Sequence, residues 1–223
     1  MMQAEISTEM QDEIRDVLSD YGKIRERLFI RLCNREKGGE WIDGVVHRDF
    51  LDFAIVPYID LSHITGISAA GAIPHGMAIG LGIPEETVME DALGNSPRIK
   101  PLKIRKLSDL MEELMGKVTG ADVPQEALDN GLSVITNEGV SYGAAAALYP
   151  GVLERMAEEK DADLLLIPSS VHEFLVLADD ALFTKEEMEA LIRDVNRDEV
   201  ADSDILSNHL YRFDRKTGEI RRA

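Results

Sequence analysis

The clearest pattern of apolar and polar positions lies in residues 132–180. An apolar run over residues 132–136 predicts a strand. The alanine-rich stretch from Gly143 predicts a helix that ends before Pro150, because proline lacks a backbone donor and clashes with the preceding turn. Pro150 can in turn start a second helix. Two short apolar runs then predict an antiparallel hairpin, with strands over residues 163–167 and 174–177.

The most specific local signal is a capping box, in which Thr184 is followed three residues later by Glu187. The helix that it starts is expected to reach residue 195 or 200. Its apolar residues recur at helical spacing and are expected to face inward. They are Met188, Leu191, Ile192 and Val195.

A second hairpin is predicted at the C-terminus, over residues 206–213 and 219–222, with Gly218 as the left-handed residue of its turn. We expect this hairpin to complete the same sheet. That placement would bring His209 close to the turn at Ser169 and Ser170.

The first half has weaker periodicity. Apolar residues three and four apart predict a helix within residues 1–20, capped by Ser7 or Thr8. Residues 23–34 fit both a helix face and a strand, and we favour a helical turn followed by a strand. The remaining predictions are a loop over residues 35–40, a strand over 50–59 with Pro57 at an edge or bulge, a short helix over 75–81, and helices over 84–93 and 109–116.

Residues 117–131 hold Gly120, Pro124 and Gly131 with little apolar content, which is typical of a linker or surface loop. We therefore predict an N-terminal α+β lobe over residues 1–116, a linker over 117–131 and a C-terminal β-α-β-β-α-β-β lobe over 132–223. The expected fold class is α+β, with antiparallel-rich sheets and helices packed on one face.

Composition narrows the classes of partner. The 223 residues carry a net charge of −18, which repels phosphates and argues against direct binding of DNA or RNA. No apolar run is long enough for a membrane helix, and the charged start lacks a signal-peptide core. A single cysteine, Cys33, fits a reducing cytoplasm. The one basic stretch, residues 98–106, is interpreted as a connector that offsets neighbouring acids, with an anion or partner contact as the alternative.

Candidate chemistry is sparse. Residues 169–173 place two hydroxyls, an imidazole and a carboxylate in sequence, but a hydrolase needs them converged in space with an oxyanion hole. The scattered histidines, the lone cysteine and the absence of a phosphate loop predict no metal and no cofactor. The residues that could line a pocket or binding site are Asn137, Ser169, Ser170, His172, Glu173 and His209.

Several motifs together resemble a bacterial family of unknown function, DUF5688. They are residues 135–138, 143–144, 148–151, 166–173 and 206–219, with looser similarity at 50–56 and 92–95. The resemblance implies a fold and a bacterial origin and transfers no catalytic residue. Family members carry a further N-terminal segment that we expect this chain to lack.

These observations favour a non-enzymatic cytoplasmic binding or accessory protein with a protein partner and an undetermined oligomeric state. One alternative is a hydrolase-like enzyme that uses Ser170, His172 and Glu173, with His209 as a further candidate. The other is an acidic inhibitor or nucleic-acid mimic that binds a basic partner. Such a mimic needs a continuous negative face. Acidic residues that are dispersed over solvated surfaces would indicate only solubility.

Overall fold

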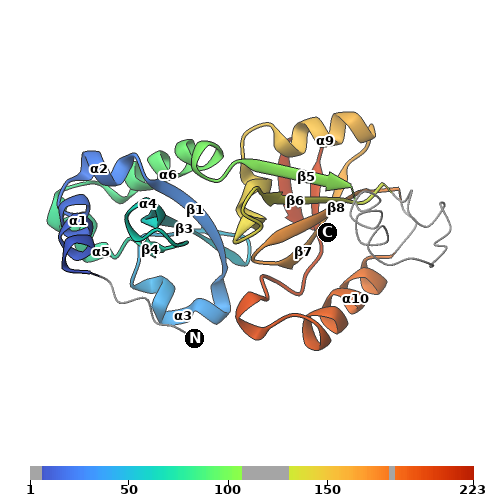
Figure 1. Ribbon diagram of the computed structural model, residues 1–223. Coiled ribbons are helices and arrows are strands. Elements are labelled where there is room, and N and C mark those ends of the chain that lie inside the picture. The colour runs from blue at the N-terminus through green and yellow to red at the C-terminus, as the bar shows by residue number, and fades with distance from the viewer. Residues whose placement is uncertain (1–6, 107–130, 181–183) are drawn as a thin grey trace, which may run out of the picture. The chain divides into compact units, whose positions relative to one another are not determined.

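The computed structural model describes residues 7–106, 131–180 and 184–223, and the chain divides into two compact units, Met1–Ile99 and Lys100–Ala223 (Figure 1). Each unit contains one antiparallel sheet with helices, so the fold class is α+β, as predicted. The predicted helix over residues 109–116 and nearly all of the predicted linker lie outside the described residues. Strand β5 (Leu102–Lys106), which the sequence analysis placed in the first lobe, pairs with the sheet of the second unit.

The first unit is built on a four-stranded sheet in which β3 pairs with β1, β2 and β4. Its strands are β1 (Leu28–Asn34), β2 (Arg48–Phe50), β3 (Phe53–Asp60) and β4 (Ala70–Ala72). Its helices are α1 (Thr8–Leu18), α2 (Tyr21–Arg25), α3 (Arg35–Asp43), α4 (Ser62–Thr65), α5 (His75–Leu81) and α6 (Glu85–Ile99). The predicted N-terminal helix, the strand after the helical turn and the short helix α5 are confirmed.

Two predicted elements of the first unit are wrong, and tertiary contacts explain one of them. The predicted loop over residues 35–40 is part of α3, which Asn34 caps by accepting from the backbone N–H of Lys37 at 2.9 Å. Helix α6 continues past Gly94 to Ile99. Its last turn is held to β1 because buried Ser96 donates to the Ala92 carbonyl and accepts from the Ile30 N–H.

Pro57 lies inside β3, opposite Ile30 of β1, and not at the end of an edge strand. The Pro57 carbonyl accepts from the Ile73 N–H, on the side of β3 that faces β2 and β4. The Pro57 nitrogen, which has no hydrogen to donate, lies on that same side. Those two strands pair with residues 53–55 and 58–60, and Pro57 falls between them. The missing N–H therefore points to the break between two short neighbours, where no ladder bond is lost.

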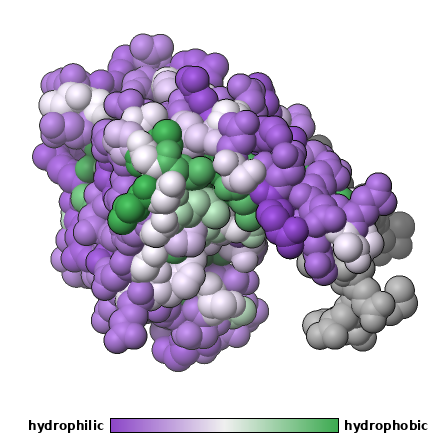
Figure 2. Space-filling model, turned by 90° about the vertical axis from the view of Figure 1, so that its left-hand side faces the viewer, coloured by the Kyte–Doolittle hydropathy of each residue, from purple (hydrophilic) through white to green (hydrophobic). Residues whose placement is uncertain are grey.

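The face drawn in Figure 2 is largely hydrophilic, with one area where hydrophobic residues gather. Isolated apolar residues on a surface are ordinary. The most exposed large apolar side chain of the described residues is Ile79 of α5, at 74%.

The second unit contains a six-stranded sheet in the order β10-β9-β7-β8-β6-β5. Its other strands are β6 (Ser133–Asn137), β7 (Leu164–Ser170), β8 (Glu173–Ala178), β9 (Tyr211–Asp214) and β10 (Glu219–Arg222). Its helices are η1 (Gly143–Leu148), α9 (Val152–Lys160), α10 (Lys185–Asp198) and η2 (Asp202–Asp204). The β7–β8 hairpin, the capping box at Thr184 and the C-terminal hairpin that completes the sheet are confirmed.

Helices cover both faces of this sheet, which corrects the expectation of one covered face. Helix α9 lies over the face of Leu102 and Ile104, whereas α10 packs its Met188 and Ile192 on Leu165. The register places Leu165 on the opposite face from Leu102, and Figure 1 shows the two helices on opposite sides of the strands. The alanine-rich segment η1 is a 3₁₀ helix of six residues, packed mainly against β6.

Candidate functional site

The turn between β7 and β8 uses its hydroxyls to hold itself together. The Ser170 hydroxyl accepts from the backbone N–H of His172 at 3.1 Å, which closes a local serine turn. The Ser169 hydroxyl donates to the Glu173 carboxylate at 3.4 Å. These bonds are what a structural turn requires, and they leave the Ser170 hydroxyl directed at backbone.

Both ring nitrogens of His172 face other groups. Its Nδ1 accepts from the backbone N–H of Tyr142 at 2.9 Å, so the neutral ring carries its proton on Nε2. That Nε2 lies 3.5 Å from the Asp204 carboxylate, and the ring packs against Tyr142 at 5.2 Å between centroids. Neither nitrogen is therefore placed to take a proton from Ser170, which a serine nucleophile needs.

Asn137 is brought to the same region by a close approach of η1. It is 2% exposed, and its amide nitrogen donates to the Ser141 carbonyl at 2.8 Å, which closes the loop after β6. Gly143 then passes so near Thr136, Asn137 and His172 that a side chain there would collide with all three. Asn137 thus stabilises the loop after β6 and is too buried to contact a ligand.

His209 makes its polar contacts elsewhere. Within the described ranges they are with the Glu189 carboxylate of α10, at 3.5 Å from Nδ1, and with the Ser207 hydroxyl, at 3.1 Å from the backbone N–H. The C-terminal segment does reach the turn, but through Asp204, whose carbonyl accepts from the Val171 N–H at 2.8 Å. Sequence reasoning missed Asp204 because no motif connects it to residues 169–173.

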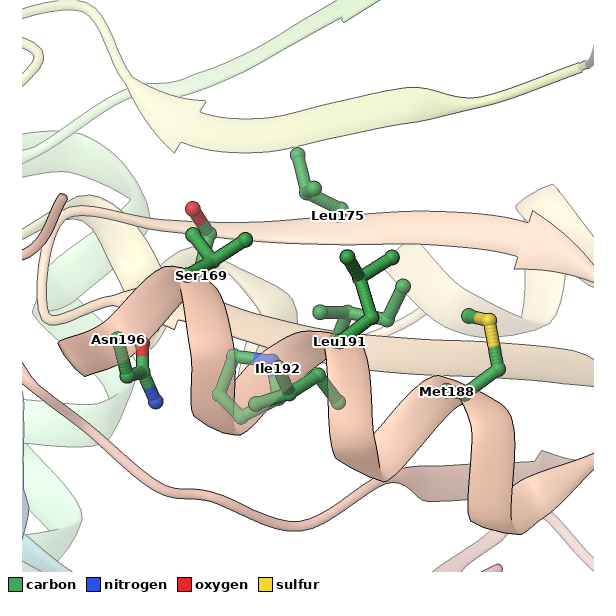
Figure 3. A pocket seen from close by; sticks show the side chains of 9 residues that line it. Ser169, Leu175, Met188, Leu191, Ile192 and Asn196 are labelled. Atoms are coloured by element: carbon green, nitrogen blue, oxygen red, sulfur yellow. The ribbon is translucent and has the colours of Figure 1, made fainter. Parts of the chain in front are cut away.

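A shallow apolar groove adjoins this turn, between α10 and the β7–β8 hairpin (Figure 3). Its volume is about 100 Å³. Leu191 projects from α10 towards the strand that carries Leu175, and Ser169 and Asn196 lie at one end. The groove is lined by Ile167, Pro168, Ser169, Leu175, Met188, Leu191, Ile192, Val195 and Asn196. Ser169 is the one residue of the predicted site that lines it.

The groove exists because the apolar stripe of α10 is wider than the part of the β7–β8 hairpin against which the helix packs. Met188 and Ile192 are buried, as predicted, but Leu191 and Val195 are 59% and 41% exposed. The sequence signal was present in the spacing of these four residues, which does not distinguish a core contact from an open apolar face.

Across residues 7–106, 131–180 and 184–223, no group of three or more histidine, cysteine, aspartate or glutamate side chains is arranged to hold a metal ion. Within the same ranges, every helix is too short or too polar to cross a bilayer.

The fold and the groove define an α+β protein of two units, the second of which presents an apolar groove beside α10. In that unit Ser170 and His172 are not paired as nucleophile and base. The chain belongs to the DUF5688 family of unknown function, whose model matches residues 1–215. The resemblance inferred from the motifs is thereby confirmed, and it extends over the first half as well. The match begins at residue 1, and the further N-terminal segment of other family members stays a prediction. Comparisons with curated proteins and with solved structures gave no match.

Proposed function

We propose that this chain is a non-enzymatic binding protein of the bacterial cytoplasm, and that the groove beside α10 receives an apolar side chain of a protein partner. The observation that carries the proposal is the exposure of Leu191 and Val195 beside the partly buried Leu175. Burial of such a surface against a partner removes apolar area from water, which is the main driving force of association. The bacterial origin rests on the family resemblance, and the cytoplasm on the single cysteine.

The groove and the charge of the chain together describe the partner. A volume of about 100 Å³ is smaller than the roughly 150 Å³ cavity that holds benzene, so it suits one aliphatic side chain. The net charge of −18 attracts a cationic chain and repels an acidic one. We therefore expect a peptide segment with a leucine-like anchor flanked by lysine or arginine.

The hydrolase alternative has less support. Ser170 accepts from the backbone of its own turn, and His172 is engaged on both nitrogens. Replacement of Ser170 by alanine should leave any esterase activity towards p-nitrophenyl butyrate unchanged. A specific loss of such activity in this variant, with the fold intact, would restore the alternative.

The binding proposal can be tested with a random peptide display library, selected on the wild-type protein and counter-selected on Leu191→Ser. Selected peptides should share an apolar anchor and a positive net charge. The Leu191→Ser protein should bind a synthetic peptide from the selection about 5- to 30-fold more weakly than the wild type does. This range corresponds to about 1–2 kcal/mol, since roughly half of a leucine side chain remains to be buried.

The matched control is Ile79→Ser, which removes an equally apolar and more exposed side chain from the other unit. It should leave peptide affinity unchanged. The proposal fails if the library yields no peptides that distinguish the wild type from Leu191→Ser, if the selected peptides are acidic, or if both substitutions weaken binding equally.

A further inference from the structure

A second and larger cavity lies on the other face of the same sheet, under α9. It measures about 520 Å³, within the range of about 300–1,000 Å³ that is typical of small-molecule sites. Leu102 and Ile104 of β5 and Met156 of α9 form an apolar wall. The cavity is therefore large enough for a small organic molecule with an apolar body.

Three cations from two separate elements, β5 and α9, also line this cavity: Lys106, Arg155 and Lys160. Side chains alternate along a strand, so Lys106 shares the face of Leu102 and Ile104. In register with Lys106 is Ser133 of β6, whose hydroxyl side chain also lines the cavity. Arg155 and Lys160 come from α9.

Of the basic residues in the 98–106 stretch, only Lys106 lines the cavity, and Arg98, Lys100, Lys103 and Arg105 do not. Lys103 and Arg105 alternate to the opposite face of β5. Arg98 belongs to α6 of the first unit and donates to the Glu26 carbonyl. The cluster is thus assembled by the fold and is not the basic stretch visible in the sequence.

Among the described residues, no carboxylate lies within 4.0 Å of any of these three cations, although Glu159 also lines the cavity. Arg155 donates to the Gly151 carbonyl at 3.0 Å, and the Lys160 amine donates to the Gly131 carbonyl. Burial holds the pKa of Lys160 below its usual value, while the charge of Glu159 raises this pKa and that of Lys106 lowers it. An anion in the cavity would favour the charged form of Lys160.

Three cations around one cavity are unexpected in a chain of net charge −18. The cation at the end of α9 has an ordinary role, since a lysine there complements the helix dipole. That role explains Lys160 alone. It does not explain why Lys106 and Arg155 face the same space beside a hydroxyl and an apolar wall.

We propose that this cavity binds a small amphipathic organic anion, whose carboxylate or phosphate group lies against Lys106, Arg155 and Lys160 and whose apolar body lies on Leu102, Ile104 and Met156. Charge-assisted hydrogen bonds hold the head group, and burial of the apolar body supplies the remaining affinity. The site is on the opposite sheet face from the α10 groove and does not depend on the function proposed for it.

The test is calorimetric titration of the full chain with four probes: octanoate, octyl phosphate, 1-octanol and inorganic phosphate. At least one of the two amphipathic anions should bind at least about tenfold more tightly than 1-octanol and than inorganic phosphate, because only these anions use both parts of the cavity. The two anions distinguish a carboxylate site from a phosphate site. Affinity should fall as the salt concentration rises.

Lys106→Met and Arg155→Met remove a charge and keep an aliphatic stem, and each should weaken binding of the tighter anion about tenfold. Lys103→Met is the matched control, since it makes the same change on the same strand but on the opposite face. It should leave the affinity unchanged. Arg155 is exposed on α9, so its variant should fold even if Lys106→Met does not.

Three results would overturn the proposal. The first is equal binding of octanoate, octyl phosphate and 1-octanol. The second is binding of inorganic phosphate as tightly as octyl phosphate, which would remove the role of the apolar wall. The third is an equal loss in Lys103→Met and in the two cavity variants. Leu191→Ser should leave octanoate binding intact, so failure of the groove proposal remains distinguishable.

Discussion

Among the described glycines of the second unit, Gly143 is the one at which an added Cβ would meet the closest neighbours. An added Cβ would lie 2.3 Å from the Thr136 hydroxyl oxygen, 2.6 Å from the Asn137 backbone nitrogen and 2.8 Å from the His172 carbonyl oxygen. Two of these three atoms are backbone and cannot move without moving β6 or the β7–β8 turn. Its φ is not positive, so the requirement for glycine at this position is one of space.

The cost of Gly143→Ala can be estimated from these contacts. Overpacking in a well-packed region costs about 1–3 kcal/mol. The methyl group also displaces the Thr136 hydroxyl, which donates to the His172 carbonyl at 2.9 Å, and loss of that bond adds about 1 kcal/mol. We expect the free energy of unfolding of the second unit to fall by about 2–4 kcal/mol.

Urea denaturation followed by far-UV circular dichroism measures this change, with an expected decrease of the midpoint by about 1–2 M for a typical m-value. The single tryptophan, Trp41, lies in the first unit, so its fluorescence reports that unit separately. Gly139→Ala is the control, because its Cβ would meet only the Asn137 side-chain oxygen, at 3.4 Å. If Gly143→Ala unfolds at the same urea concentration as Gly139→Ala, the close-approach reasoning is refuted.

Two other predictions follow from shifted pKa values. Burial raises the pKa of the Cys33 thiol to about 11. Alkylation of Cys33 by iodoacetamide at pH 8 should therefore be at least about a hundredfold slower in the folded chain than in the urea-unfolded chain. Similar alkylation rates in the two states would contradict this prediction. The backbone N–H of Arg215 and the Arg212 side chain donate to the Asp163 carboxylate and lower its pKa. Ionised Asp163 therefore stabilises the fold above the unfolded-state pKa of about 3.9. This stabilisation is lost as the pH falls through the lower pKa of the folded state. Asp163→Asn should therefore be less stable than the wild type at pH 7 and converge with it near pH 2 in urea titrations, whereas a pH-independent difference would exclude ionisation as the cause.

Local patterns predicted the elements whose causes are local. The Thr184 capping box, the left-handed Gly218 and the β7–β8 hairpin depend on residues only a few positions apart, and all three are present. Predictions failed where distant residues compete with a local signal. Gly94 reads as a helix end, yet α6 continues past it because Ser96 bonds to Ile30, which lies 66 positions away.

The candidate site divides in the same way. The sequence identified the chemically suggestive turn over residues 169–173, but its contacts with Tyr142 and Asp204 depend on how η1 and the segment after α10 meet it. These partners lie roughly thirty positions away on either side, and no spacing rule reaches them.

The sequence by itself determined the fold class, the hairpins, the main helices of the second unit and the family, because hydrophobic period, turn residues and capping act over a few neighbouring positions. Only the tertiary structure decided which apolar faces are covered and which charges converge. Leu191 and Ile192 are adjacent in the same apolar stripe, yet one is exposed and the other buried. Lys106 and Lys103 belong to the same basic stretch, yet only Lys106 reaches the cavity under α9. The physical reason is that burial and charge pairing depend on what a packed neighbour covers, and that neighbour comes from a remote part of the chain.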